Sequence, residues 1–261
     1  MLLKGKIALV TGSTSGIGFA CARSLAAEGA TIAINGFGKP DSVAAICAEL
    51  SELSGAPTVY FPADLSQPED NRNLVQQVQD SFGGVDILIA NAGIQHVEAV
   101  ETFPSQKWDE ILAINLSSPF HLIKAVLPLM RRNQWGRIIA TASIHSTVAS
   151  AFKSAYVAAK HGVVGLVKTV ALETAGSGIT VNAISPGYVW TPLVEQQIPD
   201  TMRARGMTRE QVLKDVILAA QPSGEFVMVE QIAALALFLC RPEAAQITGA
   251  NYMMDGGYTA R

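Results

Sequence analysis

The sequence has few charged residues, few cysteines and no surplus of basic side chains. Charged residues make up 16% of the 261 residues, and the formal net charge is -3. Nucleic acids and anionic membrane surfaces bind proteins with a basic face, so the composition argues against both as partners. Cys21, Cys47 and Cys240 are far apart. They predict neither a disulfide framework nor a zinc site, and we expect a reducing compartment and no bound metal.

Long hydrophobic runs are also missing. The longest, residues 232–240, is too short to cross a bilayer. Residues 1–6 lead directly into the apolar run 7–10, without the hydrophobic region of a signal peptide. We therefore expect a soluble, cytoplasmic protein. Apolar residues nevertheless make up 49% of the chain, which is typical of a compact α/β protein with buried parallel strands.

Segments with strand character alternate with helical segments along the chain. The predicted strands are 7–10, 31–35, 58–61, 86–90, 137–142, 179–184 and 250–254, and the predicted helices are 19–28, 42–53, 67–82, 106–131, 154–174 and 230–240. This alternation predicts a doubly wound parallel sheet with helices on both faces. No repeat or linker interrupts it, so we expect one domain over residues 1–261. Residues 190–222 lack a clear period and contain three prolines, which predicts an irregular substrate lid.

A glycine-rich segment follows the first predicted strand. Gly12, Gly16 and Gly18 have the spacing G-x-x-x-G-x-G. Such glycines allow a tight turn and close approach of the backbone, and the following helix presents its N-terminus to a pyrophosphate. An ordinary strand-to-helix turn is the alternative. Residues 35–38 contain neither an acid nor a base, which favours NAD over NADP. Asp64, after the third strand, can accept a hydrogen bond from an adenine amino group.

A tyrosine and a lysine lie four residues apart in the predicted helix 154–174. Tyr156 and Lys160 therefore share a helix face. We expect the lysine charge to lower the tyrosine pKa, which makes a phenol usable as a general acid/base near neutral pH. Ser143, at the end of a predicted strand, can hydrogen-bond the same reacting oxygen. Because a single Tyr-x-x-x-Lys pair is common in helices, this interpretation depends on the surrounding motifs.

Taken together, these motifs resemble the classical short-chain dehydrogenases/reductases. TGSTSGIG at 11–18, NAG at 91–93, Asn115, Ser143, the Tyr156/Lys160 pair and PG at 186–187 occur in the order and spacing of that family. The resemblance implies a seven-stranded Rossmann-type sheet, a nicotinamide cofactor, and a homotetramer packed through 106–131, 154–174 and the C-terminal segment. It implies that Tyr156 is the general acid/base, Lys160 tunes it and binds the nicotinamide ribose, Ser143 orients the carbonyl, and Asn115 supports a proton-relay water. The cofactor-binding residues that it implies are Gly12, Thr14, Ser15, Gly16, Ile17, Gly18, Phe37, Asp64, Leu65, Asn91, Ala92, Gly93, Tyr156, Lys160, Pro186, Gly187, Val189 and Thr191.

A narrower resemblance is to the bacterial (R)-3-hydroxybutyrate dehydrogenases. It rests on NAGIQH at 91–96, HSTVASAFKSAYVAAKHGVVG at 145–165, TPLVEQQI at 191–198 and the terminal DGGYTAR. It implies reversible NAD-dependent oxidation of (R)-3-hydroxybutyrate to acetoacetate. A cation beside several polar donors is what a small carboxylate requires, and Gln95, His145, Lys153 and Gln197 would supply them. The implied substrate-binding residues are Gln95, Ser143, His145, Lys153, Tyr156, Tyr188, Gln197 and Tyr258. The chain departs from these relatives at Tyr188 and Tyr258, where they have tryptophan, and at Trp190, where they have arginine.

Two other functions stay open at this point. One is reduction of 3-oxoacyl thioesters on coenzyme A or a carrier protein, which would favour a basic rim at the cleft. Arg203 and Arg205 offer only a weak one. The other is a nucleotide-sensing or interaction protein without catalysis, which would not need the set of Asn115, Ser143, Tyr156 and Lys160.

Overall fold

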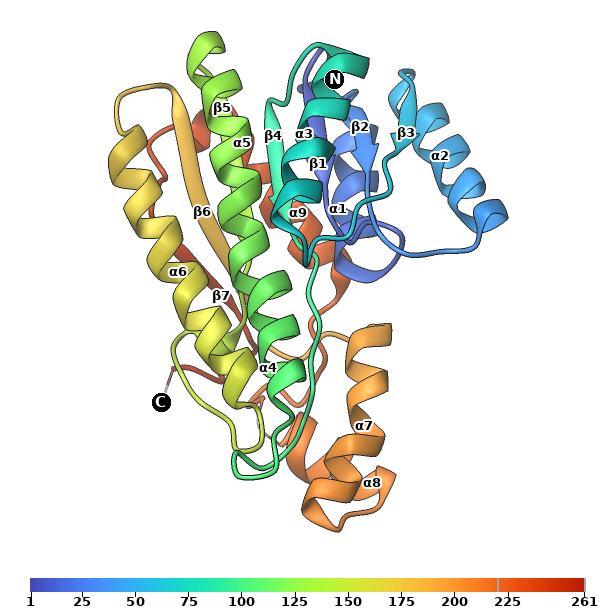
Figure 1. The fold of residues 1–261 in the computed structure, drawn as a ribbon, viewed down its shortest axis with the longest axis vertical. Coiled ribbons are helices and arrows are strands. Elements are labelled where there is room, and N and C mark those ends of the chain that lie inside the picture. The colour runs from blue at the N-terminus through green and yellow to red at the C-terminus, as the bar shows by residue number, and fades with distance from the viewer. Residues whose placement is uncertain (220, 261) are drawn as a thin grey trace.

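A single sheet of seven parallel strands forms the centre of the protein (Figure 1). The computed structural model describes residues 1–219 and 221–260. Its strands are β1 (Ile7–Val10), β2 (Thr31–Ile34), β3 (Thr58–Tyr60), β4 (Ile87–Ala90), β5 (Gly136–Thr141), β6 (Ile179–Pro186) and β7 (Asn251–Met254). Their order is β3-β2-β1-β4-β5-β6-β7. This confirms the predicted seven-stranded Rossmann-type sheet. The order reverses between β1 and β4, where sheets of this kind open a crevice at their carboxyl ends.

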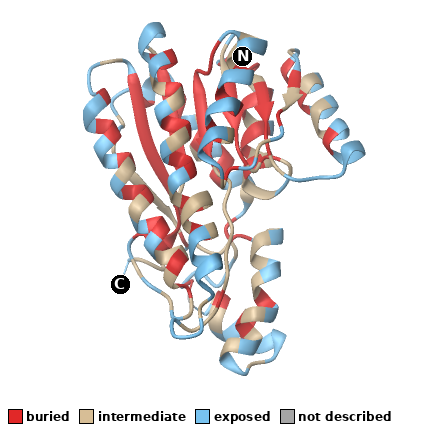
Figure 2. Ribbon diagram, in the orientation of Figure 1, coloured by how far each residue is buried: buried red, intermediate tan, exposed pale blue. Residues whose placement is uncertain are grey.

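Helices cover both faces of the sheet. They are α1 (Gly16–Ala27), α2 (Pro40–Ser54), α3 (Pro68–Phe82), α4 (Ser105–Leu112), α5 (Ser118–Asn133), α6 (Ser154–Thr174) and α9 (Val229–Leu239). Alternate strand residues point to opposite faces, so Leu9 belongs to the core cluster formed with α3, α5 and α6, and Val10 to the cluster formed with α1 and α9. Figure 2 shows the resulting pattern, with buried strands between helices whose outer faces are exposed.

The predicted helix 106–131 is not continuous. A π-helical turn, Ala113–Ser117, separates α4 from α5. Single π-helical turns inside helices are frequent at functional sites, because the extra residue in the turn re-aims the side chains around it. Asn115 lies in this turn and is 1% exposed. The wide turn therefore directs this asparagine into the protein.

The prediction that residues 190–222 are irregular is wrong. This part, which we call the lid segment (residues 190–219), forms α7 (Pro192–Arg205), α8 (Arg209–Gln211) and a π-helical turn, Val212–Leu218. Thr191 caps α7 by accepting a hydrogen bond from the Val194 amide, and Pro192 suits the first helical turn. The lid segment has its own apolar cluster around Ile198, Val212 and Ile217. In Figure 1 it projects from the end of the sheet opposite the N-terminus.

Two helical stretches, Ser105–Asn133 and Ser154–Thr174, are long and apolar enough to cross a membrane by length and composition alone. The sequence expectation above considered uninterrupted apolar runs and did not detect them. Both stretches contribute buried residues to the core under the sheet, such as Val126 and Val167. Helices that bury one face in a protein core pass the same test, so this finding alone indicates no membrane segment.

Candidate active site

The glycine-rich turn between β1 and α1 has the shape of a phosphate cradle. Gly12 and Gly16 have positive φ angles of 61° and 55°, which side-chain-bearing residues rarely adopt. At Gly18 an added Cβ would lie 2.2 Å from the carbonyl oxygen of Gly12, so only glycine fits there. Ser15, the N-cap of α1, makes no side-chain capping bond. The N-terminal amides of α1 can therefore bind an anion, and the turn fits the pyrophosphate of a dinucleotide.

The residues expected around the adenosine half follow β2 and β3. Phe37 is 86% exposed, and its carbonyl accepts a hydrogen bond from Thr14 Oγ1 (2.7 Å). Asn35 is buried, and its side-chain Nδ2 donates to the carbonyl of Phe61 (3.1 Å). Asn35 thus joins the ends of two strands and is not available to a ligand. Asp64 is exposed and accepts hydrogen bonds from the backbone and side chain of Ser66 through one carboxylate oxygen.

The small-residue turn after β4 supports the glycine turn. Asn91 Nδ2 donates to the carbonyl oxygens of Thr11 (3.0 Å) and Gly12 (3.2 Å). Gly93 lies against the π-helical turn, where an added Cβ would be 3.3 Å from Asn115 Oδ1. Residues 91–93 therefore connect the cofactor side of the crevice to Asn115.

Asn115 is held by the backbone of Ile94. Its Oδ1 accepts from the Ile94 amide (2.9 Å), and its Nδ2 donates to the Ile94 carbonyl (2.8 Å). An amide group has further hydrogen-bonding capacity on both atoms. Asn115 is thus held in place by Ile94, and its side-chain amide keeps hydrogen-bonding capacity for a further partner.

Ser143, Tyr156 and Lys160 come together at the carboxyl end of β5. Ser143 follows this strand and is 7% exposed. Its hydroxyl accepts from the His145 amide (3.2 Å) and hydrogen-bonds Tyr156. Lys160 Nζ lies 5.6 Å from the centre of the Tyr156 ring, as expected for residues on one helix face. The ammonium donates to the carbonyl of Thr141 (2.6 Å), which fixes it beside the tyrosine.

The expected lowering of the Tyr156 pKa by Lys160 is wrong for this structure. Burial raises the pKa of Tyr156, and the hydrogen bond from Ser143 opposes this only in part. Burial also lowers the pKa of Lys160 to about 8. Sequence spacing gave the proximity of the two groups correctly, but it carries no information about how strongly the surrounding protein desolvates them.

A second buried cation faces the lid segment. Lys153, the residue before α6, is 8% exposed, and burial and the charge of Arg205 lower its pKa to about 8. Lys153 Nζ donates to Gln197 Oε1 on α7 (3.3 Å), and Gln197 Nε2 donates to the Leu193 carbonyl (3.0 Å). The same ammonium lies 5.5 Å from the centre of the Tyr188 ring. Lys153 therefore connects the start of α6 to the lid segment.

His145 lies edge-on to Tyr156, with 6.2 Å between ring centres. Its Nδ1 is 3.3 Å from the carbonyl of Val148. A carbonyl only accepts, so Nδ1 carries the proton and Nε2 is an acceptor when the ring is neutral. Burial, with a contribution from the charge of Lys153, lowers the pKa of His145 to about 4. At neutral pH, Nε2 in this arrangement thus suits a hydroxyl or water better than a carboxylate.

The other residues expected to bind substrate include Gln95, Tyr188 and Tyr258. Gln95 has its side-chain oxygen buried without a hydrogen-bond partner among the described residues. Burial, with smaller contributions from Tyr258 and Tyr156 and an opposing one from Arg205, raises the pKa of Tyr188 to about 12, so these side chains share one region. Trp190 packs edge-on against Phe226, with 5.3 Å between ring centres.

Sequence reasoning missed Gln221. It is 1% exposed, its Oε1 accepts from the Tyr188 amide, and its Nε2 donates to the Glu225 carbonyl. An added Cβ at Gly187 would lie 2.2 Å from Gln221 Oε1. Gln221 therefore shapes the turn that presents Tyr188. A glutamine in a segment predicted to be irregular gave no signal of this role.

Comparisons with known proteins agree with the fold. A family model described as enoyl-(acyl carrier protein) reductase matches residues 12–259. The chain is 56% identical to D-beta-hydroxybutyrate dehydrogenase of Rhizobium meliloti, covering 98% of this chain and 99% of the relative. It is 50% identical to the enzyme of the same name from Cupriavidus necator over 100% of both chains. A crystal structure of levodione reductase matches with a TM-score of 0.89 and 32% identity, covering 99% of each chain.

The chain belongs to the short-chain dehydrogenases/reductases. It is an oxidoreductase that uses a nicotinamide cofactor and acts on a small molecule.

Proposed function

We propose that this protein catalyses the reversible, NAD-dependent oxidation of (R)-3-hydroxybutyrate to acetoacetate. The observation that carries the proposal is the buried Lys153, held by Gln197 of the lid segment beside the Ser143–Tyr156 pair. A hydroxy acid would place its reacting oxygen at the tyrosine and its carboxylate at the lysine. Two relatives that share at least half of the sequence are named for this reaction.

In the direction of reduction, Tyr156 donates its proton to the keto oxygen while Ser143 holds that oxygen by a second hydrogen bond. Because burial raises the pKa of Tyr156, the phenol is protonated at neutral pH and able to act as the acid. Lys160, fixed by Thr141, keeps a positive charge near the phenolate that forms. The bound nicotinamide supplies the hydride. In the direction of oxidation the same groups act in reverse.

The choice of NAD rests on the loop after β2. No basic side chain occurs at positions 35–38, and Asn35 is used by the carbonyl of Phe61. A 2′-phosphate would need a cation there. The cofactor contacts that we propose are those implied by the family resemblance, with the glycine turn at the pyrophosphate. Comparing the kcat/KM for NADH with that for NADPH tests this choice.

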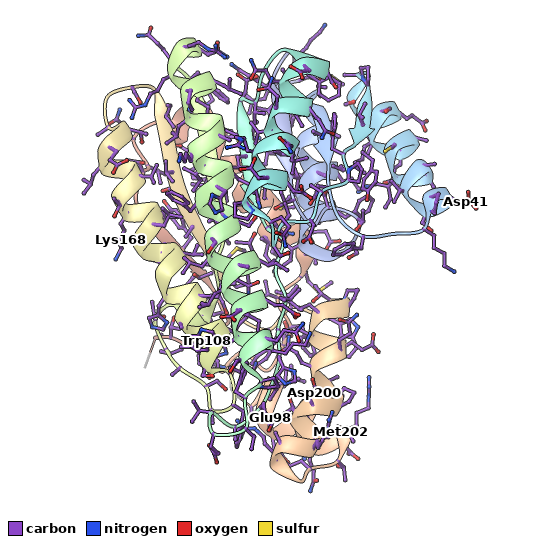
Figure 3. All side chains as sticks on the ribbon, viewed as in Figure 1. Asp41, Glu98, Trp108, Lys168, Asp200 and Met202 are labelled. Carbon is purple, nitrogen blue, oxygen red and sulfur yellow. The ribbon has the colours of Figure 1, made fainter. Side chains whose placement is uncertain are left out.

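The substrate is tested by following NADH absorbance with acetoacetate, its methyl ester and acetoacetyl-coenzyme A. We expect turnover of acetoacetate and poor turnover of the methyl ester and the thioester, in which the carboxylate is no longer free. Lys153→Met should lose activity on the acid, whereas Lys168→Met should not, because Lys168 is exposed on the outer face of α6 (Figure 3). A preference for the thioester would refute the proposed substrate and favour the reductase alternative.

We also propose that residues 1–261 form one domain with its lid segment, and that the protein is a cytoplasmic homotetramer. Phe120 on α5 is 45% exposed and Leu172 on α6 is 80% exposed, so the outer faces of these helices offer apolar surface to another subunit. Light scattering after size-exclusion chromatography measures the assembly. Phe120→Glu should shift it toward smaller species, and an unchanged mass would contradict packing through α5.

A further inference from the structure

The lid segment and the residues before α6 enclose a small cavity of about 20 Å³. Its polar lining includes Lys153, Tyr188, Gln197, Thr201 and Arg205, and it includes no acidic side chain. A cavity of this volume holds one small polar group, about as large as one or two water molecules. The cavity thus has two cations and room for one small polar group.

Arg205 differs from the other arginines of the lid segment. Arg203 pairs with Asp200 (2.5 Å), and Arg209 pairs with Glu195 (3.6 Å). Within residues 1–219 and 221–260, no carboxylate oxygen lies within ion-pair distance of Arg205 or of Lys153. Two positive charges around a cavity repel each other, and an anion between them removes that repulsion.

The backbone before α6 contributes to this arrangement. Phe152 has a φ of 68°, a left-handed conformation that is rare for a bulky residue and costs energy. The guanidinium of Arg205 lies 5.6 Å from the centre of the Phe152 ring, within reach of a cation–π interaction. The strained residue therefore provides a support for Arg205 and directly precedes Lys153.

We propose that Arg205 is a specificity-determining residue, which recognises the carboxylate of short 3-oxo and 3-hydroxy acids together with Lys153 and selects them over neutral ketones. This rests on the proposed function. Lys153 is buried and Arg205 is exposed, so the acid passes from a solvent-facing cation to a buried one. The lid segment carries Arg205, and closure over an acid brings the two charges to the same carboxylate.

The test compares Arg205→Gln with Arg203→Gln, a matched control on the same helix whose guanidinium pairs with Asp200. The substrates are acetoacetate and its methyl ester. For Arg205→Gln we expect KM for acetoacetate to rise about tenfold at low ionic strength. A loss of this size is larger than that of an exposed ion pair and smaller than that of a buried hydrogen bond to a charged group. The KM for the ester and both kcat values should change little. Arg203→Gln should behave as the wild type, and Arg205→Lys should recover part of the loss.

Measurements at increasing salt concentration distinguish recognition of the carboxylate by Arg205 from a purely structural role of this residue. An exposed charge that attracts an anion is screened by ions, so the difference between the wild type and Arg205→Gln should narrow as ionic strength rises. An equal loss for acid and ester, or no change in their ratio, would overturn the inference. If the wild type itself prefers the ester or the thioester, the proposed function has failed instead, so the two failures can be told apart.

Discussion

Replacement of Lys153 by methionine should make the protein more stable while removing its activity on the acid. Lys153 is 8% exposed, and its pKa is lowered from 10.5 to about 8, mainly by burial. A depression of this size corresponds to about 3 kcal/mol of unfavourable free energy for holding the charged form in the folded protein. Methionine has a similar length and no charge, so it removes this cost.

Part of the gain is lost with the hydrogen bond to Gln197. Lys153 Nζ donates to Gln197 Oε1 at 3.3 Å, and Gln197 is only half-buried. A hydrogen bond from a charged group is worth about 1.5–3 kcal/mol, and this long one belongs at the lower end of that range. The expected net gain is therefore about 1.5 kcal/mol at pH 7, or a rise in Tm of about 3 °C for a chain of this size. Differential scanning calorimetry or thermal melting of the two proteins without ligand measures it.

Because the pKa of Lys153 is lower in the folded protein than in the unfolded chain, the stability difference between the two proteins should depend on pH. Below pH 8 the lysine is charged in both the folded and the unfolded chain, so the full cost is present. Between about pH 8 and 10.5 the folded protein releases the proton before the unfolded chain does, and wild-type stability rises relative to Lys153→Met. The advantage of the variant should therefore disappear across this interval. A variant that is less stable at pH 7, or an advantage that does not change with pH, would refute the assignment of Lys153 as a buried, uncompensated cation.

Three further predictions follow from the site. Tyr156→Phe should lower kcat about 10²–10⁴-fold, the usual contribution of a general acid/base, while the protein still binds NADH, as measured by fluorescence titration. Gly18→Ala should destabilise the protein by about 1–3 kcal/mol through overpacking against Gly12, whereas Gly165→Ala, with open space around its Cα, should not; thermal melting compares them. Because the pKa of His145 is lowered to about 4, His145→Gln should lose less stability than the wild type when acidified from pH 6.5 to 4; equal acid sensitivity in urea titrations would contradict this.

The sheet could be predicted because each of its strands is a short apolar run between helical segments. Runs such as 87–90 are fully buried, and burial on both faces leaves a continuous apolar sequence. The proximity of Tyr156 and Lys160 could be predicted because their spacing determines a shared helix face. These features depend on local sequence, where periodicity and glycine spacing are informative.

The features that escaped prediction depend on contacts between distant segments. The π-helical turn around Asn115 is stabilised by hydrogen bonds to Ile94, 21 residues away. The helices of the lid segment begin at the capping residues Thr191 and Thr208. The prolines in this stretch had suggested an irregular structure without helices. Arg203 and Arg205 look equivalent in sequence. Only the structure shows that one is paired with a carboxylate and that the other lines the cavity.

The two buried lysines beside Tyr156 are held in different ways, and this difference suits them to different tasks. Lys160 donates to the carbonyl of Thr141 at the end of β5, so its position depends on the rigid sheet. Lys153 donates to Gln197 on α7, so its surroundings depend on the lid segment. Opening of that segment would rehydrate Lys153 and leave Lys160 in place. On the proposed function, an acid bound at Lys153 would therefore favour the closed arrangement, and binding of its carboxylate would be coupled to exclusion of water from the reacting carbonyl.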